Sequence, residues 1–545
     1  MYLYKRSPLI LLLLLVCSCN SSDEDTTPTA TTEAENCITD QVLNDARGDC
    51  GVSLVFTSQF QESTSGTTRT VMSNSIPSHR VGLFGGGMNS LNPNAISKAN
   101  TGALITGAMR NIPGIVSAVN PTLLAQHVSE ITYNEDSCYE TIQWNFDGYY
   151  TGPLMDLQTV INLNNSENAA DYSSSGSVGM QKGVAHLLKV YMMHVITDTW
   201  GAVPYSEALQ GVDNLKPAFD DQSAVYASML AEIDAALSFL DGGGLSGDFM
   251  FNGDAAKWRQ FGNTMKMVMA LRMADADPAM AEAKFKEAVS GGVLGSNADN
   301  VHYPYTTSDD NDNPWQDRFQ SREDYAASDV MVDHLFANSD PRLAKYAAPV
   351  VSATGDTSKI DYVEYGGNTY AGMPYGVLNP GILQTRISFL PSSVIYDGTN
   401  AGGMLYSYAQ VCFSYAEAHL RGWSGLAGDA QTWYELGIAA SHAQWGVSTA
   451  DATAYLGSVA PVSMETMATE KWVALYLQGH EAWSEWRRLD YPVLTPATDA
   501  LTGTGIPVRY GYGATTASAN KANHDAAVAK ISGYSQDSKV WWDTK

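Results

Sequence analysis

Residues 197–209, TDTWGAVPYSEAL, place two aromatic rings beside two carboxylates. The four side chains are Asp198, Trp200, Tyr205 and Glu207. A flat aromatic ring can pack against the C–H face of a sugar, and a pair of carboxylates can hydrolyse a glycosidic bond. The same residue types also occur where a helix ends and the chain packs back over a core. The stretch therefore indicates a sugar-binding surface, a hydrolytic pair or a structural helix end.

Three further carboxylates, Glu417, Glu481 and Glu485, lie in helical runs near aromatic residues. Glycosidases need two carboxylates that the fold brings together, so sequence spacing alone does not exclude such a pair. Glu481 and Glu485 are one helical turn apart and are followed by Arg487 and Arg488, which is typical of structural ion pairs. The chain has no GxSxG, HExxH or GxxxxGK[ST] motif. We therefore favour a structural role for these carboxylates.

A calcium site is the one metal site that the sequence suggests. Asp309, Asn311 and Asn313 have the alternate spacing of the first ligands in a calcium-binding loop. An EF-hand also needs a glycine and a glutamate where this chain has Pro314 and Gln320. An EF-hand is thereby excluded, and we name no metal ligands. An irregular calcium site remains an alternative to a solvated polar loop.

Long irregular stretches, 52–100, 290–330 and 351–402, separate the helical parts of the chain. Loops of this length usually carry function, and aromatic residues in them are not required by a helical stripe. Glycines among them allow a ligand to approach the backbone closely. The predicted ligand-binding residues are Tyr303, Tyr305, Trp315 and Arg318 in one loop and Tyr365, Asn368, Tyr370 and Tyr375 in another. The alternative is that these rings fold back and pack the loops themselves.

Apolar residues recur with the helical period in four runs, which are 183–196, 223–240, 404–421 and 465–488. Two other segments resemble the two helices of a tetratricopeptide repeat. Residues 258–262, WRQFG, are similar to the opening of the first helix. Ala281, Phe285 and Ala288 have the spacing of the second helix. We predict a mostly α-helical protein built from degenerate tetratricopeptide-like helix pairs with long irregular loops.

The N-terminus has the features of a lipoprotein signal peptide. Lys5 and Arg6 precede the apolar run 9–16, which is too short to span a bilayer. Ser18 before Cys19 resembles a lipobox, which makes Cys19 the predicted lipidated residue. We predict a signal peptide over residues 1–18 and a flexible acidic tether over residues 19–36, whose acidic cluster resembles a surface-export signal.

The formal net charge of −27 argues against nucleic acid and anionic lipid headgroups as partners. No run after the signal peptide is long enough to span a membrane. The cysteines form no CxxC motif. Cys37 and Cys50 are close in sequence, so the sequence permits a disulfide between them without deciding whether it forms. Cys412 is predicted to be a buried free thiol.

Three sequence blocks resemble the SusD/RagB family of outer-membrane lipoproteins, in particular its SusD-like subgroup. The first is residues 197–205, TDTWGAVPY, and the second is AEA at 416–418 followed by Arg421-Gly422. The third is KWVALY at 471–476 with EAW at 481–483 and WRR at 486–488. Residues 340–343, DPRL, and 506–510, IPVRY, are similar as well. One departure is Glu470, where the family pattern has glutamine, which we interpret as a change of a surface polar group.

The resemblance implies a cell-surface nutrient-binding lipoprotein of the outer membrane, with residues 37–545 as a single domain. Such a protein captures a glycan, or a peptide in some members, and delivers it to a SusC-like TonB-dependent barrel. The resemblance implies no enzymatic activity and no cofactor. A surface glycosidase and a purely structural lid on the barrel remain less favoured alternatives. The ligand itself is not defined by the sequence.

The resemblance also favours a structural interpretation of residues 197–205, because the family retains this block across different ligands. It implies that Gly201 ends a helix in a left-handed conformation and that Trp200 packs against the core. Asp198 is expected to accept hydrogen bonds from backbone donors.

Overall fold

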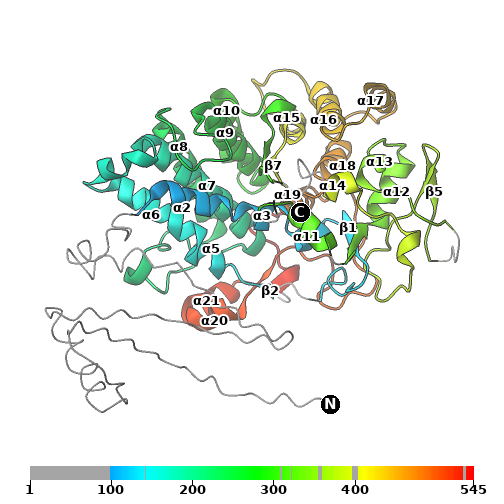
Figure 1. Ribbon diagram of the computed structural model, residues 1–545, viewed down its shortest axis with the longest axis horizontal. Helices are drawn as coiled ribbons and strands as arrows, with labels where there is room; N and C mark the ends of the chain where they lie inside the picture. The colour runs from blue at the N-terminus through cyan, green and yellow to red at the C-terminus, as the bar shows by residue number, and fades with distance from the viewer. Residues whose placement is uncertain are drawn as a thin grey trace, which may run out of the picture. The chain divides into compact units, whose positions relative to one another are not determined.

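Helices account for most of the structure in the computed structural model (Figure 1). The described residues are 99–140, 143–306, 308, 310–320, 322–353, 359–395, 403–531 and 535–545. The predicted signal peptide, the lipidated Cys19, the acidic tether and the Cys37–Cys50 pair lie outside them. Residues from Lys98 to Lys545 cluster as one compact unit. None of the described helices is long and apolar enough to cross a membrane.

The α-helices have the following bounds in the first half of the chain: α2 Thr101–Met109, α3 Ile112–Val116, α4 Val119–Leu124, α5 Asp147–Thr151, α6 Pro153–Asn165, α7 Val178–Trp200, α8 Gln222–Phe239 and α9 Ala255–Arg272. They continue with α10 Pro278–Gly291, α11 Pro314–Gln320, α12 Asp329–Ala337, α13 Leu343–Tyr346, α14 Ser392–Ile395, α15 Tyr408–Leu420 and α16 Ala430–Gln444. The last are α17 Thr449–Leu456, α18 Met464–Ala474, α19 Gly479–Leu489, α20 Ala514–Ala519 and α21 Lys521–Val528.

Strands in the described part of the chain form four two-stranded sheets. Three are antiparallel: β1 (Val128–Glu130) with β4 (Tyr325–Ala327), β3 (Val301–His302) with β7 (Met404–Tyr406), and β5 (Val363–Tyr365) with β6 (Asn368–Tyr370). The fourth pairs β2 (Gln143–Trp144) with β8 (Gly511–Tyr512) in parallel. Because the paired strands are mostly far apart in sequence, these short ladders fasten the loops to the helical frame.

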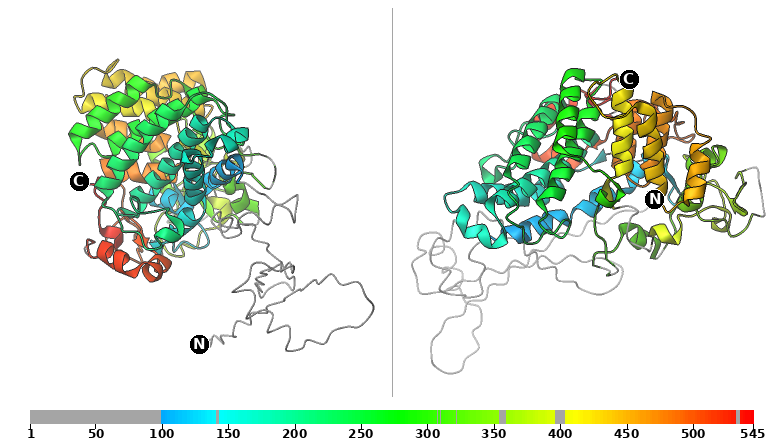
Figure 2. Two further views of the ribbon diagram at one scale, coloured as in Figure 1. Left: turned by 90° about the vertical axis from the view of Figure 1, so that its left-hand side faces the viewer. Right: turned by 90° about the horizontal axis from the view of Figure 1, so that it is seen from above.

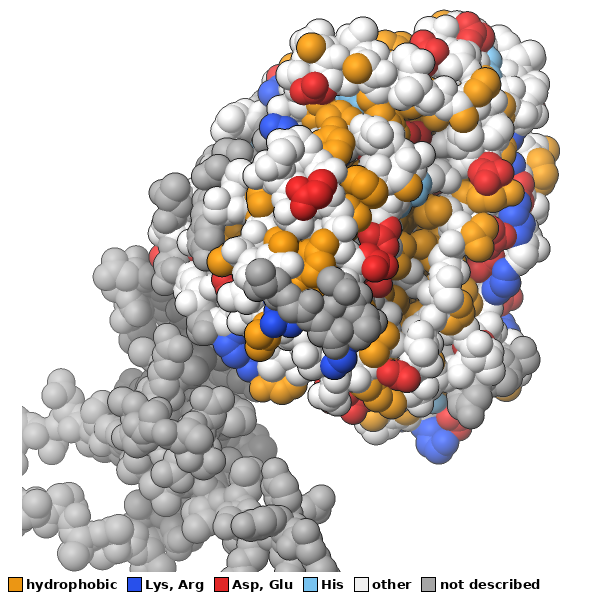
Figure 3. Space-filling model, turned by 90° about the vertical axis from the view of Figure 1, so that its right-hand side faces the viewer, with side chains coloured by type: hydrophobic (Ala, Val, Ile, Leu, Met, Phe, Trp, Pro, Cys, Tyr) orange, Lys and Arg blue, Asp and Glu red, His pale blue; other side chains and the backbone are white. Residues whose placement is uncertain are grey.

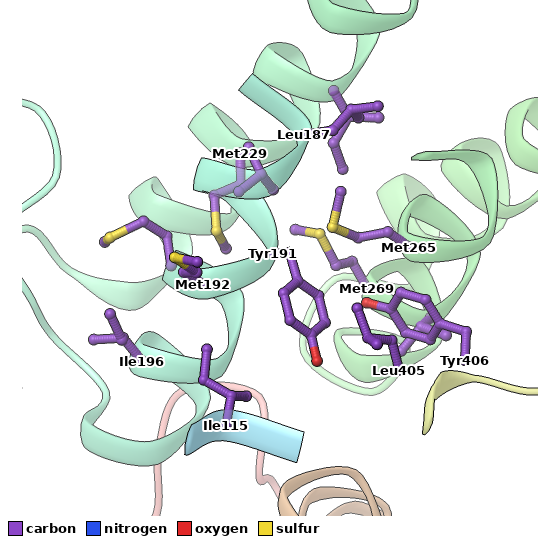
Figure 4. Packing of buried hydrophobic residues seen from close by; sticks show 14 of the residues in the cluster. Ile115, Leu187, Tyr191, Met192, Ile196, Met229, Met265, Met269, Leu405 and Tyr406 are labelled. Carbon is purple, nitrogen blue, oxygen red and sulfur yellow. The ribbon is translucent and has the colours of Figure 1, made fainter. Parts of the chain in front are cut away.

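Successive helices pack as pairs along one side of this unit (Figures 1 and 2). The main pairs are α7 with α8, α9 with α10, and α15 with α16. The apolar stripe of α7 meets α8, α9 and β7 in a core rich in methionine and tyrosine (Figure 4). Leu187, Met229 and Met265 come from three different helices and are all buried there. Methionine suits this position because its flexible chain fills irregular gaps between helices.

The predicted tetratricopeptide-like pair is confirmed as α9 and α10. Trp258 of α9 and Phe285 of α10 are fully buried. Gly262 allows close approach, because a Cβ there would lie 2.9 Å from side-chain atoms of both Leu187 and Leu237. Large residues therefore fill spaces that small residues leave open, as the repeat pattern indicates. The mostly helical fold class is confirmed.

Two helical predictions need correction. The run 465–488 is two helices, α18 and α19, because Leu477 between them has a φ of 63° that a continuous helix does not permit. The run 404–421 begins with strand β7 before α15 starts at Tyr408. Cys412 is a buried free thiol on α15, as predicted.

The helices are joined by a network of buried ion pairs. Arg488 of α19 donates to both oxygens of Glu417 of α15, at 2.7 Å for Nη2–Oε2, and to Glu485 at 2.6 Å. Lys471 of α18 also pairs with Glu485. Burial alone would raise the pKa of Glu417, but the positive charges of Arg488 and Arg421 lower it to about 2. Glu417 and Glu485 are therefore structural, as predicted.

A second centre of the network is Asp198 at the end of α7. Its carboxylate accepts hydrogen bonds from Tyr226 and from Trp542 Nε1, the latter at 2.9 Å, and lies 3.1 Å from His194. Arg272 lies 3.4 Å from Asp198 and 2.5 Å from Glu481. The donors to Asp198 are thus side chains, which corrects the expectation of backbone donors. The carboxylate fastens the C-terminal residues to two helices.

The remainder of the stretch 197–209 is structural too. Trp200 is buried, and its Nε1 donates to the carbonyls of Trp144 and Gly511 at 3.1 Å each. Gly201 has φ 80° and ψ −116°, so φ is positive as predicted, while ψ lies outside the left-handed helical region. Glu207 accepts from the backbone N–H of Ala218 at 3.0 Å. The structural interpretation of this stretch is therefore the one that the geometry supports.

Glu470 is not a surface residue, which corrects the interpretation of the departure from the family pattern. It is buried, pairs with Arg342 at 2.6 Å and accepts a hydrogen bond from Tyr455 at 2.5 Å. Arg342 also pairs with Asp340 at 2.5 Å. A charged residue is accommodated here because a buried arginine neutralises it.

We predict that Arg488→Met lowers the free energy of unfolding by about 3–5 kcal/mol, because it leaves Glu417 and Glu485 buried with too little positive charge. Urea unfolding followed by circular dichroism measures the change. The control is Lys521→Met, which breaks the exposed pair with Asp525 and should change the urea midpoint far less. Equal effects of the two variants would show that the buried network is not a major source of stability.

Candidate functional site

A cavity with a volume of about 460 Å³ lies beside the β1–β4 ladder. Its lining residues are Thr132, Phe319, Gln320, Arg322, Glu323, Asp324 and Gln384. The backbone N–H of Ile131 donates to the carbonyl of Asp324 at 2.8 Å, which fixes the two sides of the cavity to each other. Helix α11 positions the third side, because it turns Trp315 and Phe319 inward and ends at Gln320.

An exposed tyrosine stands next to this cavity. Tyr133 is 55% exposed, the highest value among the aromatic residues that the structure describes. Arg322 holds its ring: Nη1 donates to the tyrosine hydroxyl at 3.0 Å, and the guanidinium carbon lies 4.8 Å from the ring centre. Nη2 of the same arginine pairs with Asp324 Oδ2 at 2.7 Å. The contacts Tyr133–Arg322–Asp324 therefore hold the exposed ring of Tyr133 in a defined position beside Arg322, which lines the cavity, while Tyr133 itself is not a lining residue.

The polar groups around the cavity are planar amides and carboxylates together with one guanidinium group. Gln384 donates to the backbone carbonyl of Glu323 at 3.3 Å, which leaves its amide oxygen as an acceptor. Planar side chains of this kind can form paired hydrogen bonds with neighbouring hydroxyl groups of a sugar. The arrangement suits a polar ligand with an apolar face.

An acidic group lies behind the cavity at the end of β1. Glu130 is 3% exposed, and its Oε2 has no hydrogen-bond partner. Burial raises the pKa of Glu130 from 4.5 to about 8, and the negative charges of Asp136 and Asp324 add to the effect. Asp324 is 8% exposed, and its Oδ1 also has no partner. With this pKa, Glu130 is mostly protonated at neutral pH and adds little negative charge at this end of the cavity.

The structure buries two of the predicted residues in the first loop. Trp315 is completely buried in a core with Phe319 and Leu335, and Tyr303 is 1% exposed, with its hydroxyl donating to Asn311 at 2.6 Å. Their rings present no face to a ligand, which corrects the expectation for both. For Trp315 and Tyr303 the structure shows the alternative interpretation, in which aromatic rings fold back and pack inside the loop. The ring of Tyr303 packs against Phe249 and Tyr305, and the ring of Trp315 packs against Tyr325.

The other two residues of that loop are partly exposed. Tyr305 is half-buried against the ring of Tyr303, with 4.9 Å between the ring centres. Arg318 is half-buried, and its guanidinium carbon lies 4.9 Å from the centre of the Trp315 ring. Neither lines the 460 Å³ cavity. Their contact with a ligand stays a prediction.

The second predicted loop is the β5–β6 hairpin and the segment after it. Gly366 and Gly367 form its turn with φ of 58° and 78°. Tyr370 and Tyr375 are 2% and 7% exposed, so their rings are packed inside, which corrects the expectation for both. Tyr365 is half-buried and Asn368 is exposed at the turn. These two do not line the cavity, and their contact with a ligand stays a prediction.

Sequence reasoning missed Tyr133, Thr132 and Gln384. Tyr133 lies in a short acidic segment, ITYNEDSCYE, outside the long loops that we searched. Sequence reasoning did indicate the stretch 290–330, which contributes Gln320 and Arg322 to the cavity. A signal that could have been used is the helical period of residues 314–320, which predicts that Trp315 and Phe319 face one way and Gln320 another.

No group of three or more His, Cys, Asp or Glu side chains in the described residues is arranged to hold a metal ion. Asp309 of the calcium-like loop lies outside those residues, so an irregular calcium site stays a prediction. A second cavity of about 20 Å³, next to Gln478 and His480, has room for about one water molecule and not for a sugar.

We predict that Trp315→Ala lowers the free energy of unfolding by about 3–5 kcal/mol, because the truncation leaves a void in a packed core. The urea midpoint measures this loss. Trp144→Ala is the matched control, because that ring is 43% exposed, and its loss should be clearly smaller. A Trp315→Ala protein as stable as the wild type would mean that this ring is not packed in the core.

The raised pKa of Glu130 also predicts that the stability of the protein depends on pH. Its pKa is higher in the folded protein than in the unfolded chain, so the folded state binds more protons between about pH 4.5 and pH 8, and stability falls as the pH rises through this window. Glu130→Gln should remove this loss, which amounts to about 2–4 kcal/mol between pH 5 and pH 9. Urea unfolding at the two pH values measures it. The exposed Glu435→Gln is the control and should leave the pH dependence unchanged.

Comparisons with known proteins place this geometry in a family. A solved structure described as a chitin-binding protein is 27% identical, with a TM-score of 0.71, and the match covers 82% of this chain and 100% of that one. A SusD homolog from Bacteroides uniformis is 22% identical, with a TM-score of 0.67 over 81% of this chain and 99% of that one. A chitin-binding SusD homolog from Flavobacterium johnsoniae is 24% identical, with a TM-score of 0.64 over 82% and 99%.

A search of curated proteins finds no match to this chain. The model of the SusD-like family, described as starch-binding and associating with the outer membrane, matches residues 93–513. Because this match covers most of the sequence, the chain belongs to the SusD-like family of nutrient-binding proteins that associate with the outer membrane.

Proposed function

We propose that this protein captures a glycan at the cavity beside Tyr133 and delivers it to a SusC-like TonB-dependent transporter in the outer membrane. The observation that carries the proposal is the exposed ring of Tyr133, held by Arg322 next to a cavity of about 460 Å³. A tyrosine ring held in one orientation offers an apolar face and a hydrogen-bonding tip, which suits contact with a sugar.

The cavity and the neighbouring Tyr133 together supply the two kinds of contact that a sugar needs. Gln320 and Gln384 in the lining can form hydrogen bonds with hydroxyl or acetamido groups. A sugar that extends past Arg322 can place its C–H groups on the exposed ring of Tyr133. Most of the energy then comes from a few defined contacts, which is usual for small-ligand sites. The volume is sufficient for a few sugar rings and not for a long folded segment.

The relatives narrow the choice of glycan. The 27% identical structure is described as chitin-binding, which supports chito-oligosaccharides as the first ligands to test. The family description supports starch fragments as the second. The proposal includes anchoring at the cell surface by a lipid on Cys19, and it includes no catalytic step and no cofactor. Tyr305, Arg318, Tyr365 and Asn368 remain proposed contacts outside the cavity.

We predict that Tyr133→Ala weakens binding of the glycan by about tenfold or more, because it removes the ring face and one partner of Arg322. Calorimetric titration of the full chain, purified in a mild detergent, with chito- and malto-oligosaccharides measures the affinity. Trp144→Ala is the control, because this ring is also exposed but belongs to β2, whereas Tyr133 contacts the lining residue Arg322.

Three results would contradict this assignment. Loss of binding in Trp144→Ala but not in Tyr133→Ala would move the site to the β2–β8 ladder. Binding of a mixture of peptides without binding of any oligosaccharide would replace the glycan with a peptide as the captured nutrient. Products of hydrolysis after long incubation would contradict a purely binding role.

A further inference from the structure

Helix α19 begins inside the protein without a side-chain cap. The first N–H groups of a helix have no partner within the helix, so a cap, a water molecule or a ligand must accept their hydrogen bonds. Gln478 occupies the N-cap position of α19, and its side chain forms no capping hydrogen bond. Gly479, the first residue of the helix, is buried, and a Cβ there would lie 2.3 Å from Thr122 Oγ1. Helix α4 therefore covers this uncapped end of α19.

The side chain of Gln478 is buried without a partner as well. It is 4% exposed, and neither its amide oxygen nor its amide nitrogen forms a hydrogen bond with a described residue. Native proteins rarely leave a buried amide in this state, because it loses its bonds to water and gains none in return. Since the oxygen accepts and the nitrogen donates, a molecule that satisfies both must be able to donate and to accept.

A small cavity lies at this end of the helix. Its lining includes Gln478, His480 and Glu481 from the start of α19, Tyr191 from α7 and residues of β7, and its volume is about 20 Å³. A buried water molecule needs at least about 10–15 Å³ of such volume and two to four polar partners. The cavity therefore has room for one water molecule, and it is too small for a sugar or an amino acid.

A hydroxyl group from α7 belongs to the same lining. Tyr191 is 5% exposed, and its hydroxyl forms no hydrogen bond with a described residue. Figure 4 shows this hydroxyl pointing away from Leu187 and Met265, on the side where Ile115 lies, and Ile115 is itself a lining residue. The Tyr191 hydroxyl can donate or accept, so it provides a second polar partner beside the Gln478 amide.

The charges around the cavity favour a neutral molecule over an anion. A helix N-terminus attracts anions, but here Glu481 in the first turn brings a carboxylate into the lining. Its Oε1 accepts from Arg272 and from Gln410, at 2.5 Å and 2.8 Å, which leaves Oε2 as an acceptor. Neither Lys nor Arg is a lining residue, and burial, with the charge of Arg487, lowers the pKa of His480 to about 3. At neutral pH the His480 ring is therefore uncharged and offers an anion no positive charge.

We propose that one water molecule is bound in this cavity and serves as the cap of α19. It bonds to the Gln478 amide, the Tyr191 hydroxyl and Glu481 Oε2, a set that contains both donors and acceptors. Because Tyr191 belongs to α7, the water links the start of α19 to α7 beside the buried pair of Arg272 and Glu481. The site is separate from the proposed glycan site and does not depend on it.

A high-resolution crystal structure of the full chain tests whether the water is present. We expect electron density in the cavity within hydrogen-bond distance of the Gln478 amide and the Tyr191 hydroxyl. Crystals pressurised with xenon give the complementary measurement, because xenon enters dry apolar cavities and should not enter this one. A cavity without density, or one that takes up xenon, would overturn the proposal. An anomalous signal of chloride at this position would replace the water with an anion.

Gln478→Met tests the capping role through the sign of the change in stability. Methionine is about as long as glutamine and cannot form the amide hydrogen bonds. If a water bonds to the amide, the variant removes a satisfied polar group, and the urea midpoint should fall. If the amide has no partner, its removal relieves a cost, and the midpoint would rise. Gln210→Met is the matched control, because this glutamine is exposed, and its midpoint should stay close to that of the wild type.

Tyr191→Phe provides a second test that removes one hydroxyl group and keeps the ring. The proposal expects a lower urea midpoint here too, because the hydroxyl is satisfied by the water. A higher or unchanged midpoint in this variant would count against the bound water. If Gln478→Met does not fold, as circular dichroism would show, Tyr191→Phe and the xenon measurement decide between a hydrated and a dry cavity.

Discussion

The structure depends above all on the pairing of buried charges between helices that lie far apart in sequence. Arg488 joins α19 to α15 through Glu417, and Arg272 joins α9 to α7 and α19 through Asp198 and Glu481. A buried ion pair adds little net stability over an apolar contact, but a buried charge without its partner is strongly destabilising. Helix pairs that could slide along apolar stripes are thereby restricted to one register. The irregular loops around the cavity need such a fixed frame to hold their own positions.

This network explains why the fold could be predicted from the sequence. The blocks that resemble the family, including residues 416–418, 486–488 and 340–343, are those that contribute the buried charges. Their residue types are constrained by partners, so they form a readable pattern. The boundary between α18 and α19 was missed for a local reason, because the apolar period continues through Leu477 while its backbone turns. Glu470 was misplaced on the surface because its partner, Arg342, is 128 residues away.

The site was less predictable, because the decisive property is which way a side chain points. Trp315 and Arg322 belong to the same stretch, yet the tryptophan is buried and the arginine is exposed. A count of loop aromatic residues does not distinguish a ring that packs a loop from one that meets a ligand. Tyr133 carries no motif, and it becomes notable only when β1 and β4 bring it to Arg322, 189 residues away. Proximity of this kind is a property of the fold, and a single sequence does not reveal it.

Buried carboxyl groups in the helical frame and beside the cavity have pKa shifts of opposite direction. Glu417 in the frame is neutralised by two arginines, and its pKa falls to about 2 despite burial. Glu130 at the cavity forms no ion pair with a described residue, and its pKa rises to about 8. A buried acid is therefore kept ionised by paired arginines in the helical frame, and it is kept protonated by burial beside the cavity, where no described arginine pairs with it.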